Sequence, residues 1–258
     1  MIAVRLTVYG LSALRVAVVS SPRSGNMWLR RLLVAAYGLE ERSAHTPDEI
    51  DWEALPERCA LQLHWHRTPE FRRLLRRHGF SVAVIARHPL DILVSILHFA
   101  PHEPQTARWL DGEGGDEASL LAADPASPAF LAYATGPRAQ ALLSVTPEWW
   151  PHADARTSYE ALVNDPADEL GRFVDVLGES PLVSPAEAVE AVSFGRLREE
   201  ATNQHFWQGR AGLWQELVPT RYALAIAAVH PEMLELGYTV GVDAPTARAR
   251  WTALTEAS

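Results

Sequence analysis

Short apolar runs alternate with amphipathic runs along most of the chain. The apolar runs that stand between turn signals predict buried strands, at residues 16–19, 60–65, 81–86 and 155–159. The amphipathic runs predict helices, at residues 26–37, 69–78, 91–99, 165–178 and 219–229. This alternation predicts an α/β fold, in which a central, mainly parallel sheet is flanked by helices on both faces.

Two short motifs predict helix starts. In Thr46-Pro47-Asp48-Glu49 the threonine would cap the helix, the proline would take the first position and the glutamate would complete a capping box. Ser184-Pro185-Ala186-Glu187 has the same form. Because no linker or repeat interrupts the pattern, we predict a single domain over residues 1–258.

Residues 100–148 break the alternation, since proline, glycine and acidic residues recur there. They are expected to form either a solvated loop or a substrate-facing insertion of loops and helices, because long loops in compact domains are often functional. The acids of residues 111–117 belong to this segment.

Composition and charge exclude several classes of protein. The net charge of −9 argues against a nucleic-acid partner, which would need a basic surface. No apolar stretch reaches the roughly 18 residues of a transmembrane helix, and residues 1–19 are interpreted as strand material rather than a signal peptide. Cys59 is the only cysteine, so we predict no intrachain disulfide and a cytoplasmic location.

The loop between the first predicted strand and helix, residues 20–25, is a candidate anion site. Amide groups at the start of the helix would point at a phosphate or sulfate placed above the strand. A nucleotide-binding loop of the kinase type needs a lysine and a magnesium-binding hydroxyl. All 23 basic residues are arginine, however, so Arg23 stands in the place of the lysine, and Asn26-Met27 stand in the place of the hydroxyl. A metal-dependent kinase is therefore disfavoured.

A second candidate anion site follows the third predicted strand. Arg87 stands at the carboxyl end of that strand, where open α/β sheets bind their ligands, and Ser95 lies about two turns into the next helix. A guanidinium and a hydroxyl can together hold a phosphate. In the alternative interpretation Arg87 pairs with a carboxylate and Ser95 has no role.

The second predicted strand ends in a cluster of polar residues. Strand alternation places Gln62, His64 and His66 on one face. Histidine suits proton abstraction near neutral pH, because its ordinary pKa is about 6.5. The pair could also be half of a metal site, but no suitably spaced cysteine or glutamate completes it, and we predict no bound metal.

Together these segments resemble the cytosolic-type sulfotransferases, which use 3′-phosphoadenosine-5′-phosphosulfate (PAPS). The family motif T-Y-P-K-S-G-T-x-W is similar to residues 20–28 (SSPRSGNMW), and R-N/D-P-x-D-x-x-x-S is similar to residues 87–95 (RHPLDILVS). Downstream, the elements Y-E-D/A-L…D-P, S-F and G-x-x-G-x-W resemble residues 159–166, 193–194 and 209–214. The resemblance implies a P-loop-like sulfotransferase fold.

The resemblance also implies roles for individual residues. Arg23 and the backbone of residues 24–27 would hold the 5′-phosphosulfate, Trp28 and Phe194 would sandwich the adenine, and Arg87 and Ser95 would take the 3′-phosphate. The full set implied to bind the cofactor is Pro22, Arg23, Ser24, Gly25, Asn26, Met27, Trp28, Arg87, Ser95, Tyr159, Ser193, Phe194, Gly209 and Arg210.

The catalytic base is implied by the family's K-T/S-H element. Its histidine takes the proton from the acceptor, and His64 fits that place best, with His66 on the same face as the alternative. Arg23 would assist at the leaving phosphate. The chain departs from the family pattern where Gln62 replaces a lysine and where Trp207-Gln208-Gly209 replaces R-K-G, so that Arg210 is the nearest cation to the 3′-phosphate.

We therefore expect sulfuryl transfer from PAPS, with PAP as product, to a hydroxyl of a small molecule, a glycan or a lipid. The candidate acceptor walls are His98, Phe99, His102, Trp149, Trp150 and the acidic residues 111–117. A P-loop-like kinase or nucleotide hydrolase and an inactive PAP-binding module are the alternatives. Whether the chain forms a homodimer is left open.

Overall fold

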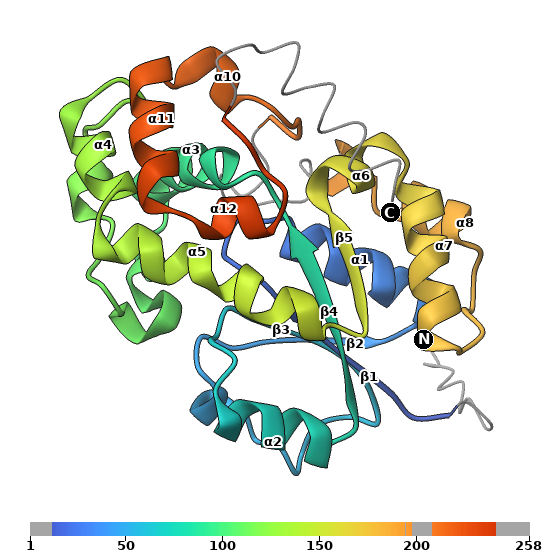
Figure 1. Ribbon diagram of the computed structural model, residues 1–258. Coiled ribbons are helices and arrows are strands. Elements are labelled where there is room, and N and C mark those ends of the chain that lie inside the picture. Colours follow the sequence, from blue (N-terminus) through green and yellow to red (C-terminus); the bar gives the residue numbers. More distant parts are fainter. Residues whose placement is uncertain (1–11, 194, 198–207, 241–258) are drawn as a thin grey trace, which may run out of the picture.

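The fold is built around a five-stranded parallel sheet (Figure 1). The computed structural model describes residues 12–193, 195–197 and 208–240. The strands are β1 (Leu14–Val19), β2 (Glu40–Ser43), β3 (Arg58–Leu63), β4 (Phe80–Ala86) and β5 (Ala155–Ser158), in the order β2-β3-β1-β4-β5. Apart from β2, every strand agrees with a predicted one to within a few residues.

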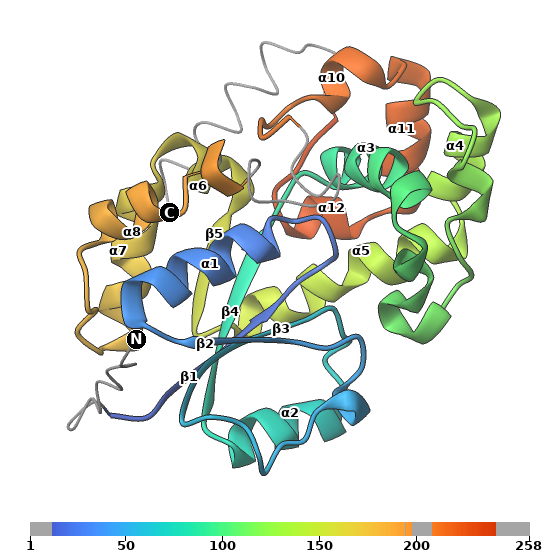
Figure 2. The same cartoon turned by 180° about the vertical axis from the view of Figure 1, so that it is seen from behind.

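Helices connect the strands and cover both faces of the sheet. They are α1 (Asn26–Tyr37), α2 (Pro69–Arg77), α3 (Pro89–Phe99), α4 (Pro128–Ala134), α5 (Pro137–Trp149), α6 (Tyr159–Asn164), α7 (Pro166–Leu177), α8 (Pro185–Ala191), α10 (Trp214–Leu217), α11 (Thr220–Val229) and α12 (Glu232–Glu235). In Figure 1, α5 crosses in front of the sheet and α1 lies behind it, and Figure 2 shows α1 from the other side.

Two apolar cores correspond to these two faces, because successive strand residues point to opposite sides. Val16, Val18 and Ile85 pack with α1, α6, α7 and α8. Ala17 and Val84 pack on the other side with α2, α3 and α5. The predicted α/β fold with helices on both faces is confirmed.

Of the two predicted capping boxes, one is confirmed and one is wrong. Ser184 and Glu187 cap each other at the start of α8. Residues Pro47–Glu49 form only a short 3₁₀ helix, η1, and the Thr46 side chain makes no capping hydrogen bond. The physical reason is the 3₁₀ turn, in which the Glu49 amide N–H donates to the Thr46 carbonyl at 3.3 Å and not to the Thr46 hydroxyl. The Glu49 carboxylate accepts the His45 amide N–H and pairs with Arg108.

Residues 100–148 form a largely helical insertion rather than a plain loop. It contains the 3₁₀ helices η2 (Ala100–His102), η3 (Pro104–Gly112) and η4 (Ala118–Leu120), followed by α4 and α5. Arg138 on α5 fixes it, because its buried guanidinium pairs with Glu117 at 2.8 Å and donates to the carbonyls of Trp109 and Thr106. One of the acids at 111–117 is therefore a buried structural group.

The remaining 3₁₀ helix, η5 (Trp150–His152), leads from α5 into β5. Within the described part of the chain, no helix combines the length and apolar character needed to cross a membrane.

Candidate active site

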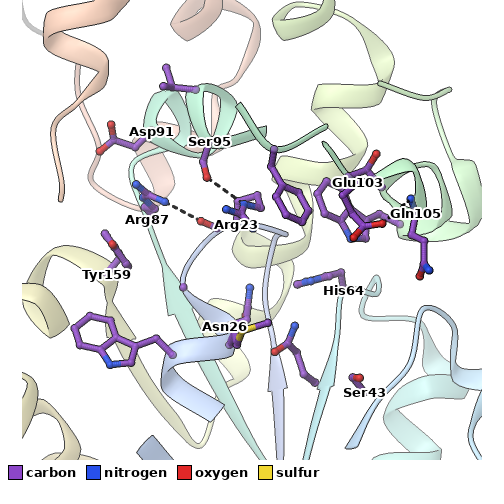
Figure 3. Close-up of a pocket in the computed structure, with 18 of the residues that line it drawn as sticks. Arg23, Asn26, Ser43, His64, Arg87, Asp91, Ser95, Glu103, Gln105 and Tyr159 are labelled. Atoms are coloured by element: carbon purple, nitrogen blue, oxygen red, sulfur yellow. Dashed lines mark hydrogen bonds between the residues drawn. The ribbon is translucent and has the colours of Figure 1, made fainter. Parts of the chain in front are cut away.

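A cavity of about 500 Å³ opens at the carboxyl ends of the central strands. Arg23, His64 and Arg87, which come shortly after β1, β3 and β4, all line it. Figure 3 shows Arg87 and Tyr159 at one end, His64, Glu103 and Gln105 at the other, and Arg23 between them. This edge is where open α/β sheets bind ligands.

The loop between β1 and α1 is held from both sides. The Ser20 hydroxyl accepts the Ile85 amide N–H of β4 at 2.8 Å. The Ser21 amide donates to the Thr146 hydroxyl of α5 at 2.8 Å, and the two hydroxyls lie 3.0 Å apart. These buried contacts fix the loop backbone before any ligand arrives.

The conformation of the loop exposes the N-terminus of α1 to the cavity. Arg23 and Gly25 have positive φ angles, and no side chain of the described residues caps the helix. The first backbone bond of the helix joins the Leu29 amide to the Gly25 carbonyl, so the amides of residues 26–28 precede it and point outward. Such a helix end attracts an anion.

The Arg23 side chain is half-buried beside Ser95 and Phe99. Its Nε donates to the Ser95 hydroxyl at 3.1 Å, and its guanidinium lies 4.1 Å from the centre of the Phe99 ring. Burial, together with the positive charge of Arg87, lowers the pKa of Arg23 to about 9. A bound anion would relieve this electrostatic cost.

Arg87 lines the same cavity, at the end where Tyr159 lies (Figure 3). Its guanidinium is 4.2 Å from the centre of the Tyr159 ring and donates to the Arg23 carbonyl at 3.0 Å. In the part of the chain that the structure describes, Arg87 forms no salt bridge with a carboxylate, so the alternative interpretation of this residue is not what is found.

Tyr159 and Trp28 form the wall on this side. Their rings meet edge to face at 6.2 Å, and both line the cavity. A Cβ atom on Gly25 would lie 2.7 Å from the Tyr159 ring, so this position accepts only glycine without a shift. Phe194, the other predicted adenine contact, lies outside the described residues.

Several buried polar atoms at this end have no protein partner within the described residues. They are Ser24 Oγ, Asn26 Oδ1, Trp28 Nε1 and Arg87 Nε. Buried polar atoms are normally hydrogen-bonded. Two arginines, a helix N-terminus and an aromatic wall suit an anionic nucleotide such as PAPS, so the residues present fit this group.

The segment after residue 207 closes the cavity through Asp91 of α3. The buried Asp91 carboxylate accepts the Gly212 amide at 2.6 Å and the Trp214 amide at 2.9 Å. This contact brings Gln208, Gly209 and Arg210 to the cavity lining. Arg210 pairs with Glu216 at 2.5 Å, and its carbonyl faces Arg87.

His64 follows β3 and lines the cavity. Its Nδ1 is 2.8 Å from the Ser20 carbonyl, which can only accept, so Nδ1 carries the proton and Nε2 keeps its lone pair. Burial lowers the pKa of His64 to about 4. The imidazole is therefore neutral at pH 7, and its ring lines the cavity.

His66 is directed elsewhere. It lies between Glu148 on α5 at 2.8 Å and Glu113 of the insertion at 3.1 Å, and it is not among the cavity-lining residues. The hydrogen bond to Glu148 raises the pKa of His66. The strand ends at Leu63, so the alternation that placed His64 and His66 on one face does not continue to His66.

The cavity includes most of the predicted site residues and several that were not predicted. Pro22, Ser24 and Ser193 do not line it, although Ser24 is buried in the loop beneath it. The lining residues to which sequence reasoning gave no role in the site are Ser43, Ala44, His45, Glu49, Asp91, Val94, Glu103, Gln105, Thr106, Trp109 and Leu213. Most of them come from separate loops, and no local motif marks them.

Histidine, cysteine, aspartate and glutamate side chains form no metal-binding group of three or more among the described residues.

Comparison with solved structures identifies the fold. The mouse sulfotransferase SULT7A1 complexed with PAP matches with a TM-score of 0.65 and 16% identity, over 95% of this chain and 89% of that chain. Retinol dehydratase in complex with androsterone and the inactive cofactor PAP matches with a TM-score of 0.57 and 16% identity, over 87% of this chain and 82% of that chain. No protein-family model and no curated protein matches the chain. The chain thus has the sulfotransferase fold.

Proposed function

We propose that this protein transfers the sulfuryl group of PAPS to a hydroxyl of an acceptor. The observation that carries the proposal is the convergence of Arg23, Arg87 and the N-terminus of α1 on one cavity, with the unprotonated Nε2 of His64 beyond them. The PAP complexes among the solved structures of the same fold support this choice of nucleotide.

PAPS supplies an activated sulfuryl group whose transfer leaves PAP. Arg23 and the amides at the start of α1 bind the phosphate from which that group departs, and they stabilise the negative charge that grows on its bridging oxygen. Because both are fixed before binding, little reorganisation is needed. Arg87 and Ser95 hold the 3′-phosphate, and Trp28 and Tyr159 line the adenine side.

His64 takes the proton of the acceptor hydroxyl at Nε2. The Ser20 carbonyl keeps the ring in the required tautomer by accepting the Nδ1–H. Removal of a positioned base lowers rates by roughly 10²- to 10⁴-fold. The remaining rate acceleration comes from positioning and electrostatic stabilisation, as in phosphoryl transfer.

The proposal is tested by following radiolabelled sulfate from PAPS into a panel of hydroxyl acceptors. We expect transfer by the wild type, loss of turnover by about 10²-fold or more in His64→Ala, and retained PAP binding in that variant. His66→Ala is the control, and it should keep most of the activity. If His66→Ala lost turnover and His64→Ala kept it, His66 would be the catalytic base.

Two other outcomes would replace the proposal. Turnover of ATP with magnesium, without sulfate transfer, would indicate a nucleotide hydrolase or kinase. PAP binding without transfer to any acceptor would indicate an inactive PAP-binding module.

A further inference from the structure

The end of the cavity beyond His64 is lined mainly by polar side chains. Phe99 and Trp109 are its large apolar members. The polar members are Ser43, His45, Glu49, Gln62, Glu103, Gln105 and Thr106. A site built for a purely apolar acceptor would show the opposite balance.

One buried polar atom and one cavity-lining hydroxyl at this end have no side-chain hydrogen bond to the described residues. The Gln62 side-chain carbonyl oxygen is buried with no hydrogen-bond partner in the described chain. Thr106 is 3% exposed and lines the cavity, and only its backbone groups bond to other described residues. Both can accept a hydrogen bond from a ligand, and the buried Gln62 oxygen can only accept one.

Glu103 adds a negative charge to this set. The 3₁₀ helix η3 fixes it, because the Thr106 amide donates to its carbonyl at 3.1 Å. Its carboxylate accepts only the Gln105 amide, at 3.3 Å, among the described residues, and forms no salt bridge with them. Glu49 differs, since Arg108 balances its charge.

A carboxylate repels an anionic cofactor bound in the same cavity. This repulsion raises the free energy of the complex unless a cation lies close to the carboxylate. The arginines that line the cavity are Arg23, Arg87 and Arg210. Arg87 lies at the end opposite Glu103, with Arg23 between them (Figure 3). Arg108, which contacts the lining residue Glu49, is already paired with that carboxylate. Gln62 is neutral, whereas the family motif has a lysine at this position. Residue 62 therefore supplies no positive charge near His64. The compensating charge would come from the acceptor.

We propose that the acceptor is a hydroxylated amine, whose ammonium group pairs with Glu103 while its hydroxyl faces His64. This inference rests on the proposed function. In the step itself, the acceptor oxygen forms a bond to sulfur and its proton passes to His64 Nε2. The bond from sulfur to the phosphate oxygen breaks, and its electron pair stays on PAP. The ammonium group keeps its protons and only positions the molecule.

The test uses three phenols that share the ring and hydroxyl and differ in end-group charge. Tyramine is cationic, 4-ethylphenol is neutral and 3-(4-hydroxyphenyl)propionate is anionic. Each is titrated calorimetrically into the full chain with PAP bound. We expect tyramine to bind at least about tenfold more tightly than 4-ethylphenol, because a hydrogen bond to a charged group is worth that much, and the propionate to bind most weakly.

The variant Glu103→Gln is expected to remove the difference between tyramine and 4-ethylphenol. Glu70→Gln, on the exposed face of α2, makes the same change in net charge and should preserve the difference. Titration of Glu103→Gln with PAP checks that the variant is folded, and its PAP affinity should be equal to or tighter than that of the wild type.

Equal binding of tyramine and 4-ethylphenol by the PAP complex would overturn the inference and leave the proposed function standing. Retention of the preference in Glu103→Gln would overturn it as well. If the wild type binds no PAP, the proposed function fails, and the same titrations without PAP still decide whether Glu103 selects an amine.

Discussion

At the scale of single residues, the chemistry depends on which ring nitrogen of His64 is free. The Ser20 carbonyl, 2.8 Å from Nδ1, leaves Nε2 unprotonated, as the proposed base must be. His66 has the same side chain but lies between two carboxylates that hold it away from the cavity. The sequence identified His64 correctly as a cavity residue, yet spacing alone could not separate the two histidines.

The pH dependence of turnover should reflect the burial of His64. Its pKa is about 4, below the ordinary value of about 6.5, and the neutral form is the active one. We therefore expect kcat/KM, which reports the free enzyme, to be flat from about pH 5 to 8 and to fall as the pH drops through about 4. An inflection near 6.5 would show that the base is an unburied histidine.

The shape of the loop between β1 and α1 depends most directly on Gly25. Its φ of +105° and the 2.7 Å approach of Tyr159 exclude a side chain. We expect Gly25→Ala to lose roughly 1–2 kcal/mol of stability through the positive φ, and about tenfold or more in PAP affinity through displacement of Tyr159 and Arg87.

Gly79→Ala is the matched control for that substitution. Gly79 also has a positive φ, +68°, but a Cβ there meets nothing within 4 Å. It should lose stability and keep PAP affinity, as measured by thermal unfolding and calorimetry. Equal PAP affinities in the two variants would mean that the loop does not form the cofactor site.

At the scale of elements, the cavity is completed by a contact between α3 and the segment before α10. Asp91 lies one helical turn beyond Arg87 and accepts amide groups of Gly212 and Trp214. Its carboxylate thus positions Gly209 and Arg210 in the cavity lining. Asp91 belongs to the second family motif and was visible in the sequence. Its partners, Gly212 and Trp214, lie more than a hundred residues farther along the chain.

We expect Asp91→Asn to weaken PAP binding and to raise the KM for PAPS with little change in kcat. In the asparagine variant, the side-chain NH2 group would face one of the two backbone N–H groups and could not accept its hydrogen bond. A hydrogen bond to a charged group contributes roughly 1.5–3 kcal/mol. Asp175→Asn, on an exposed part of α7, is the control. A fall in kcat with unchanged KM would argue against a positioning role for Asp91.

At the scale of the whole molecule, the sheet and its helices followed from local patterns. Runs such as residues 81–86 are apolar enough to identify a buried strand. β2 was missed because Glu40-Glu41-Arg42-Ser43 is an exposed polar edge strand that holds its place by pairing with β3. Most of this end of the cavity was missed for a related reason, although Phe99 was predicted: Ser43 and Glu103 come from separate loops and line one cavity only after folding.

The central claim is that this cavity binds PAPS, and thermal unfolding with PAP tests it most directly. At a hundredfold excess over Kd a ligand stabilises the fold by roughly 2.7 kcal/mol, which corresponds to a rise in Tm of about 5 to 10 °C for a chain of this size. We expect that rise with PAP, little change with ATP and magnesium, and loss of the PAP effect in Arg87→Met. A rise with ATP and magnesium and none with PAP would contradict the account.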